Sequence, residues 1–222
     1  MFSKPADSLS GATADIVVPC SAAQELDYEA ELRFVVGKDC EDVMTEDALG
    51  CKMTEDALGC ILGYAIGNER SARDYVPHEV SGYRLGYRKS FDGFAPLGPC
   101  IVSASLMGDI PKLQLQTRVN GELRQNCNTC DMIWSIPKIL AHLTRGRSLR
   151  RGTIAITRTP SSVGLGMKPP VYIKTGDAVE VTIEGLDQSG IILYSESRKP
   201  RSHHSRSCFL LLCLSILCAV SN

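Results

Sequence analysis

Residues 25–34 (ELDYEAELRF) alternate strictly between charged and apolar side chains, and this constrains the fold more than any other segment. Side chains of a β-strand point alternately to opposite faces, so the pattern predicts a strand with one apolar face. The opposite face then carries the carboxylates of Glu25, Asp27, Glu29 and Glu31.

Carboxylates two residues apart on one strand face stand roughly 7 Å from each other. Their repulsion is tolerable in water but unfavourable in a cleft, unless a cation lies between them. A hard divalent ion with oxygen ligands, Mg²⁺ or Mn²⁺, is the cation that such a pair favours. A solvated strand face is the alternative interpretation.

Composition narrows the class of protein and of partner. The 222 residues are 44% hydrophobic and 22% charged, which is typical of a globular domain. The net charge of −1 argues against nucleic-acid binding and favours small-molecule or protein partners. The ten cysteines are scattered and follow no apolar signal segment, so we expect reduced thiols. Cys127 and Cys130 form a lone CxxC pair, for which metal or redox use is the minor alternative.

Short strands dominate the remaining pattern. Residues 113–119 alternate before Asn120 and Gly121, and residues 122–125 return, which predicts a hairpin. One helix is expected from Ile136, with Pro137 in its first turn, to near Gly146. Further strands are expected at residues 153–157, 171–174, 178–184 and 191–194. Many strands with few helices predict an α+β fold rather than a doubly wound sheet.

A perfect repeat interrupts this pattern, because residues 44–51 (MTEDALGC) recur as residues 53–60. Two copies of eight residues do not form a solenoid. Thr54 begins a helix-start signal, and Ala57, Leu58 and Ala65 follow at helical spacing. We therefore expect a helix from this point, with one copy of the repeat looped out as a duplication.

Residues 1–194 are expected to form one domain, and residues 195–222 an unmatched tail that is basic and then apolar. The apolar run 208–220 has thirteen residues, whereas about 20 are needed to cross a bilayer. A disordered tail without membrane contact is therefore the favoured interpretation. No Arg-rich amphipathic leader is visible, so the cytoplasm is the expected compartment and the mitochondrion the alternative.

Six segments, in this order, closely resemble the fumarylacetoacetate hydrolase family, and the resemblance runs from about residue 3 to residue 186. They are residues 28–32 (YEAEL), 68–74 (NERSARD), 89–99 (KSFDGFAPLGP), 117–125 (TRVNGELRQ), 133–144 (IWSIPKILAHLT) and 157–170 (TRTPSSVGLGMKPP). The resemblance implies an α+β fold built on a mixed sheet rolled into a barrel-like form with few peripheral helices. It also implies a homodimer, and a divalent cation, Mg²⁺ or Mn²⁺ with Ca²⁺ as a further alternative.

The resemblance further implies hydrolase or lyase chemistry on small oxo-acids. The reactions include hydrolysis of a carbon–carbon bond in acylpyruvates or fumarylacetoacetate, and decarboxylation or tautomerisation of oxaloacetate. All of them pass through an enol or enolate that the metal stabilises as a Lewis acid.

Residue by residue, the resemblance places the metal ligands at Glu29, Glu31 and Glu69. The same-face pattern agrees for the first two, and Glu69 stands where the family generally has Asp. Lys89 is implied as the catalytic cation, and Arg73 and Thr159 as substrate-binding residues.

The sequence departs from the family where Arg88, Arg158 and Ser162 replace glycines. Side chains there are expected to narrow the cleft or displace its backbone donors. The family's upstream segment with its acid–base His and Glu pair does not occur in this sequence. Two alternatives therefore remain beside the enzyme: a family relative with impaired catalysis, and a dimeric binding module that docks through its tail.

Overall fold

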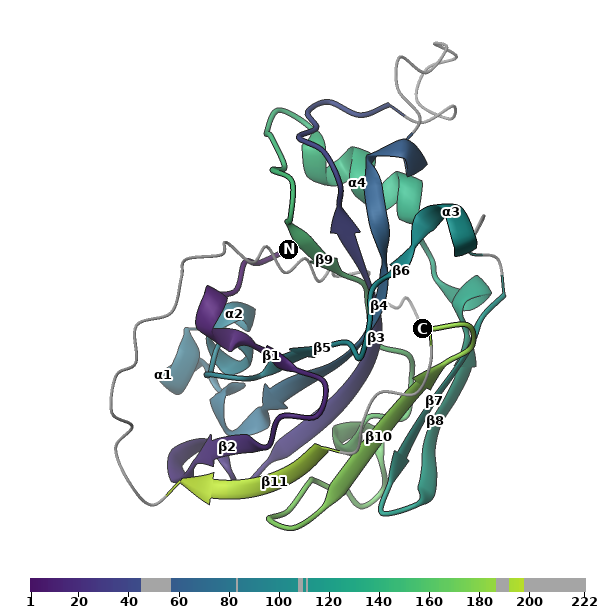
Figure 1. Ribbon diagram of the computed structural model, residues 1–222. Coiled ribbons are helices and arrows are strands. Elements are labelled where there is room, and N and C mark those ends of the chain that lie inside the picture. The colour runs from purple at the N-terminus through teal and green to yellow at the C-terminus, as the bar shows by residue number, and fades with distance from the viewer. Residues whose placement is uncertain (45–56, 83, 108–109, 111, 187–191, 198–222) are drawn as a thin grey trace.

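The computed structural model describes residues 1–44, 57–82, 84–107, 110, 112–186 and 192–197 (Figure 1). Most of the predicted duplication, at 45–56, and the tail beyond residue 197 lie outside these residues. The division of the chain into residues 1–194 and 195–222 therefore stays a prediction. No helix in the described ranges is long and apolar enough to span a membrane.

Two mixed sheets form the frame of the described chain. The first has six strands, β1 (Leu9–Gly11), β5 (Ala95–Leu97), β4 (Ile61–Ala72), β3 (Leu26–Val36) and β9 (Ile154–Ile156) in that order, with β6 (Val102–Ser103) paired to β4. The second has five strands, β2 (Ile16–Pro19), β11 (Ile192–Ser197), β10 (Ala178–Ile183), β7 (Gln114–Val119) and β8 (Glu122–Asn128). The helices are α1 (His78–Ser81), α2 (Leu85–Lys89), α3 (Ala104–Met107) and α4 (Ile136–Thr144).

The long antiparallel pair β3 and β4 runs through the middle of the molecule (Figure 1). Helices α1 and α2 lie on one side of the pair, and β7 and β8 lie on the other. Leu32 and Phe34 of β3 pack in the core with Leu115 of β7, Val181 of β10 and Leu140 of α4. Leu26 and Tyr28, nearer the start of the strand, pack in a second cluster with other residues of β7 and β10. The apolar face predicted for this strand is therefore the face that the second sheet and α4 cover.

Every residue of β3 is buried, so the alternative of a solvated acidic face is wrong. The strand begins at Leu26, which leaves Glu25 outside it. The three other carboxylates of the predicted face, Asp27, Glu29 and Glu31, are at most 5% exposed. Burying so many charges on one strand requires counter-charges close by.

The helix predicted from Thr54 is wrong in the part that the structure describes. Leu58–Cys60 form a short 3-10 turn, and residues Ile61–Ala72 form β4. Apolar residues at 61–66 fit a buried strand as well as a helix, because spacing alone does not separate the two over a short run. Pairing with β3 on one side and with β5 and β6 on the other decides in favour of the strand.

The hairpin and α4 are confirmed. Asn120 and Gly121 have φ values of 50° and 81°, as a type I′ turn requires. The strand expected at residues 171–174 is wrong, since this segment makes only an isolated bridge from Ile173 to Leu26. The α+β class with few helices is confirmed, but the described strands form two open sheets, so the barrel-like form is not confirmed.

Candidate functional site

The register of β3 and β4 gathers three of the predicted site residues. Glu29 lies opposite Glu69, and Glu31 lies opposite Gly67. Residues two apart on a strand, and residues directly opposite across a ladder, share one face of the sheet. Glu29, Glu31 and Glu69 therefore occupy one face, and their exposed fractions are 5%, 1% and 0%.

Glu29 is held by donors on both carboxylate oxygens. Its Oε1 accepts from Ser71 Oγ at 2.6 Å and from an Arg73 guanidinium nitrogen at 3.0 Å. Its Oε2 accepts from Lys89 Nζ at 2.6 Å. Burial alone would raise the pKa of Glu29, but Lys89 and Arg73 outweigh it and lower this pKa to about 2. The Glu29 carboxylate is therefore ionised at neutral pH.

Glu69 is paired with a different set of cations. Lys4 donates to Oε1, and Arg33 donates to Oε2 at 3.1 Å. The Arg33 side chain reaches Glu69 across Gly67, where an added Cβ would lie 1.8 Å from Arg33 Nε. Both ion pairs have no exposed side-chain surface. The carboxylate that the resemblance implies as the third metal ligand is therefore neutralised by cations of the protein itself.

Glu31 has no comparable compensation. Its Oε2 is buried and accepts no hydrogen bond from the described residues. Burial raises the pKa of Glu31 well above its ordinary value of 4.5, Lys89 opposes the shift, and Glu29 and Glu69 add to it. A buried acceptor without a donor, beside two further carboxylates, is a place where a cation would relieve both burial and repulsion.

The three glutamates supply only oxygen donors, which fits a hard divalent cation such as Mg²⁺ or Mn²⁺. In the present rotamers Glu29 and Glu69 are turned towards protein cations. The described His, Cys, Asp and Glu side chains accordingly form no group of three around one coordination point. The three carboxylates therefore fit such an ion in their chemistry, although Glu29 and Glu69 are paired with cations of the protein.

Asp27 connects Arg73 to the backbone at Gly164 and Leu165. Its Oδ2 accepts from Arg73 at 2.8 and 3.0 Å, and its two oxygens accept from the backbone N–H groups of Gly164 and Leu165 at 2.7 and 3.1 Å. A Cβ on Gly164 would come within 2.1 Å of the Val171 carbonyl oxygen, so only glycine fits there. The sequence analysis placed Asp27 on the acidic face but gave it no role.

Gln125, at 0% exposure, connects the carboxylate strand to the segment that carries Thr159. Its Nε2 donates to Thr159 Oγ1 at 3.1 Å and to the carbonyl oxygens of Pro160 and Ser161 at 3.3 and 3.2 Å. Its Oε1 accepts from the Ala30 backbone N–H at 3.2 Å and from Thr117 Oγ1 at 2.9 Å. Sequence reasoning missed Gln125, whose one signal is its place at the end of the segment 117–125.

A cavity of about 670 Å³ brings most of the predicted site together. Glu29, Glu31, Arg73, Lys89 and Thr159 all line it. Glu69 does not line the cavity, but it shares a sheet face with Glu29, which does. The lining also includes apolar side chains, which are those of Leu115, Met132, Ile133, Trp134, Val163 and Leu165.

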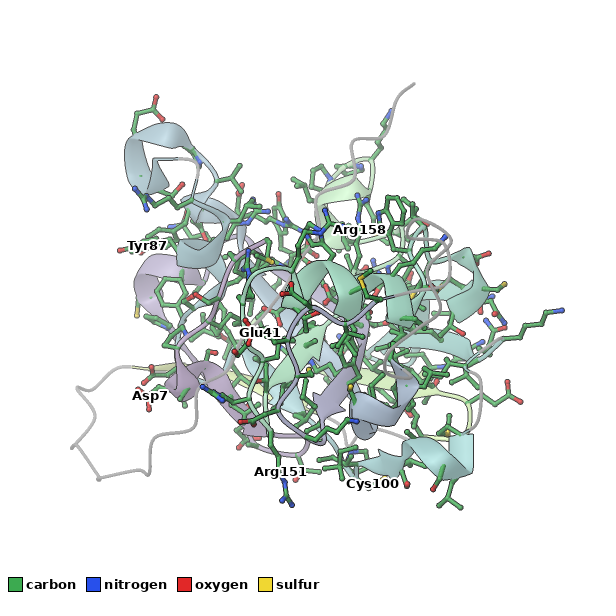
Figure 2. The ribbon with its side chains drawn as sticks, turned by 90° about the horizontal axis from the view of Figure 1, so that it is seen from above. Asp7, Glu41, Tyr87, Cys100, Arg151 and Arg158 are labelled. Carbon is green, nitrogen blue, oxygen red and sulfur yellow. The ribbon has the colours of Figure 1, made fainter. Side chains whose placement is uncertain are left out.

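Two of the three residues expected to replace family glycines line this cavity, and Ser162 lies between the lining residues Ser161 and Val163. The two that line it are Arg88 of α2 and Arg158. In Figure 2, Arg158 and the α2 residue Tyr87 lie on the same side of the view, and Arg151 lies at the opposite edge. Ser162 adopts a φ of 70°, which confirms that its backbone takes a conformation favouring glycine.

The opposite pKa shifts of Glu29 and Glu31 predict opposite effects on stability in metal-free protein. Because the pKa of Glu31 is raised in the folded protein, Glu31 lowers the stability of the fold above the unfolded pKa of about 4.5. The cost at high pH is about 1.4 kcal/mol per unit of pKa shift. Glu31→Gln should therefore raise the free energy of unfolding at neutral pH, and the gain should vanish as the pH falls below the unfolded pKa. Urea unfolding in EDTA across this pH range measures it.

Glu29→Gln is the matched variant. It removes a carboxylate whose lowered pKa stabilises the fold above pH 4.5, an effect that is lost as the pH falls towards about 2. This variant should be less stable than wild type at neutral pH. A change of the same sign in both variants would contradict the charge arrangement described above.

Comparison with known proteins agrees with the family resemblance of the sequence motifs. The family model for the fumarylacetoacetate hydrolase C-terminal domain matches residues 1–190. The mitochondrial oxaloacetate tautomerase fahd2 of Xenopus laevis is 36% identical over 186 residues, which cover 84% of this chain and 55% of that protein. The oxaloacetate tautomerase YisK of Bacillus subtilis is 38% identical over 162 residues, which cover 73% and 50%. The chain thus spans about half the length of these curated relatives.

Solved structures with a similar fold include enzymes of the same kind. A fumarylacetoacetate hydrolase from Exiguobacterium antarcticum is 36% identical with a TM-score of 0.78, covering 88% of this chain and 66% of that one. The fumarylpyruvate hydrolase of Pseudomonas aeruginosa, solved with Mn²⁺ and pyruvate, is 27% identical with a TM-score of 0.74, covering 87% and 77%. The chain therefore belongs to the fumarylacetoacetate hydrolase family and matches its C-terminal domain.

Proposed function

We propose that this chain carries the catalytic centre of a divalent-metal-dependent enzyme that forms the enolate of a small oxo-acid. The observation that carries the proposal is the set of three buried carboxylates on the face shared by β3 and β4. Two of them line a cavity together with Lys89, Arg73 and Thr159. The Mn²⁺ and pyruvate bound to the Pseudomonas aeruginosa relative support the same class of ion and ligand.

Glu29, Glu31 and Glu69 would hold the cation. When bound, a divalent ion supplies Lewis-acid stabilisation of the negative charge that develops on an enolate oxygen. We propose Mg²⁺ or Mn²⁺ because the donors are all carboxylate oxygens.

Lys89 acts as a cation and hydrogen-bond donor rather than as a base. Burial favours its neutral amine, but Glu29, Glu69 and Glu31 outweigh burial and raise the pKa of Lys89. Its ammonium therefore keeps its protons at neutral pH and donates to a developing oxyanion. This role requires a positive charge that is already in place when the oxyanion forms. A buried ammonium group provides that charge.

Arg73 and Thr159 orient the substrate. Asp27 fixes the Arg73 guanidinium at the edge of the cavity, where it can bind a substrate carboxylate. Thr159 Oγ1 already accepts from Gln125, so the threonine hydroxyl proton is available for a substrate oxygen.

Among the family's reactions, we propose keto–enol tautomerisation of oxaloacetate for the protein that contains this chain. The tautomerases from Xenopus laevis and Bacillus subtilis support this choice. Tautomerisation moves one proton between carbon and oxygen and breaks no carbon–carbon bond. Unlike hydrolysis, it therefore does not require the site to activate a water molecule as a nucleophile. A homodimer and a cytoplasmic location stay predictions.

The test combines turnover with metal binding. Wild-type protein with Mn²⁺ should accelerate the loss of oxaloacetate enol absorbance, and Lys89→Met should lower kcat by about 10²- to 10³-fold. In thermal melts, Mn²⁺ at a hundred times its Kd should stabilise wild type by about 2.7 kcal/mol and should not stabilise Glu31→Gln.

The outcomes separate the alternatives. A melting shift that depends on Glu31 without turnover above Lys89→Met would identify a family relative with impaired catalysis. The absence of any shift in wild type would refute the metal site. Hydrolysis of an acylpyruvate with no effect on oxaloacetate would replace the proposed reaction with the hydrolytic one.

Gln125→Met tests how Thr159 is positioned. The substitution keeps the length of the side chain but removes the donor that holds Thr159, Pro160 and Ser161. We expect the KM for oxaloacetate to rise about tenfold, with kcat changed less, because one charge-neutral substrate contact is misplaced.

Thr117→Val is the matched control, because Thr117 is equally buried and donates to Gln125 from the side away from Thr159. It should lower the free energy of unfolding by about 1 kcal/mol and leave KM unchanged. Equal changes of KM in the two variants would show that Gln125 contributes only to stability.

A further inference from the structure

Arg88 is the cation at the cavity whose charge has no partner in the described part of the chain. Its guanidinium makes no hydrogen bond or ion pair with the described residues, and its Nε is buried without an acceptor. The side chain lies on α2 next to Lys89, whose ammonium points to Glu29. A half-buried guanidinium without an acceptor is unfavourable unless a ligand supplies one.

The other cations that the proposed function uses are already neutralised. Arg73 is bound to Asp27 and Glu29, and Lys89 is bound to Glu29. The surroundings of Arg88 differ from those of Arg73 and Lys89. Burial is the main cause that lowers the pKa of Arg88, and repulsion from Arg73 lowers this pKa further, while the attraction from Glu29 and Asp27 is weaker. A carboxylate bound to Arg88 would offset this repulsion.

We propose that Arg88 binds a second carboxylate of the substrate, so that the cavity selects oxo-acids with a carboxylate at each end. The inference rests on the proposed function, in which Arg73 and the glutamate-bound cation take the 2-oxo-acid end. Arg88 then meets the distal carboxylate, and its planar guanidinium can bind both oxygens of that group.

This selectivity depends on a residue at which the chain departs from the family pattern. The family resemblance places glycine at position 88, and a glycine there would supply no charge to the cavity wall. The arginine therefore adds a determinant of substrate choice to a site whose other charged residues follow the family pattern, apart from Arg158 and the Asp-to-Glu change at Glu69.

The test compares two substrates that differ in one carboxylate. Oxaloacetate has a distal carboxylate and 2-oxobutanoate has a methyl group there, and exchange of their C3 protons with deuterium reports enolate formation from both. Arg88→Gln should raise the KM for oxaloacetate about tenfold more than the KM for 2-oxobutanoate, because only the first loses a charged hydrogen bond. An equal change for both substrates, or no change for oxaloacetate, would overturn the proposal.

Arg84→Gln is the matched control, since Arg84 precedes α2, is exposed and does not line the cavity. It should leave the kinetics of both substrates unchanged.

A binding measurement keeps this proposal separate from the proposed function. If wild type exchanges neither substrate, the proposed function fails, and calorimetric titration of the full chain with malonate and with acetate, at one fixed free Mn²⁺ concentration, still tests Arg88. Arg88→Gln should weaken malonate binding about tenfold more than acetate binding. Equal weakening, or none, would overturn the second-carboxylate site.

Discussion

The antiparallel pairing of β3 with β4 is the constraint on which the site depends, because it buries three glutamates on one face of a sheet. Such a face is stable only where cations reach it. Those cations come from segments far apart in the sequence: Lys4 before the first strand, Arg33 within β3, Arg73 after β4, and Lys89 at the end of α2. The same ion pairs that permit burial thus fix the N-terminal segment and α2 beside the sheet.

The pairing also explains how this chain accommodates Glu69 in place of the family's Asp. The longer side chain lies between Lys4 and Arg33, and Arg33 reaches it only because Gly67 has no side chain. A divalent ion that uses Glu69 therefore competes with two buried protein cations, whereas Glu31 offers an oxygen with no donor among the described residues. The balance between the two glutamates would set the affinity for the ion.

Local sequence predicted those parts of the fold whose signals are local. The alternation around Glu29 predicted β3, and Asn120 with Gly121 predicted the hairpin. The family motifs, together with that alternation, predicted six site residues, and five of these line one cavity. The start of β4 was mistaken for a helix, because a short apolar run has no distinctive period and strand pairing decided it. Gln125 and Arg33 escaped prediction because most of their partners are distant in the sequence: Ala30 and Thr159 lie 95 and 34 residues from Gln125, and the partners of Arg33 lie 36 and 62 residues away.

The most direct test of the carboxylate centre is anomalous diffraction from crystals of the full chain grown with Mn²⁺. The account predicts one strong peak within about 2.5 Å of carboxylate oxygens from Glu29, Glu31 and Glu69. It also predicts that Lys4 or Arg33 has moved away from Glu69. A peak bound elsewhere, or no peak while all the ion pairs of the site persist, would contradict the assignment of this face as the metal centre.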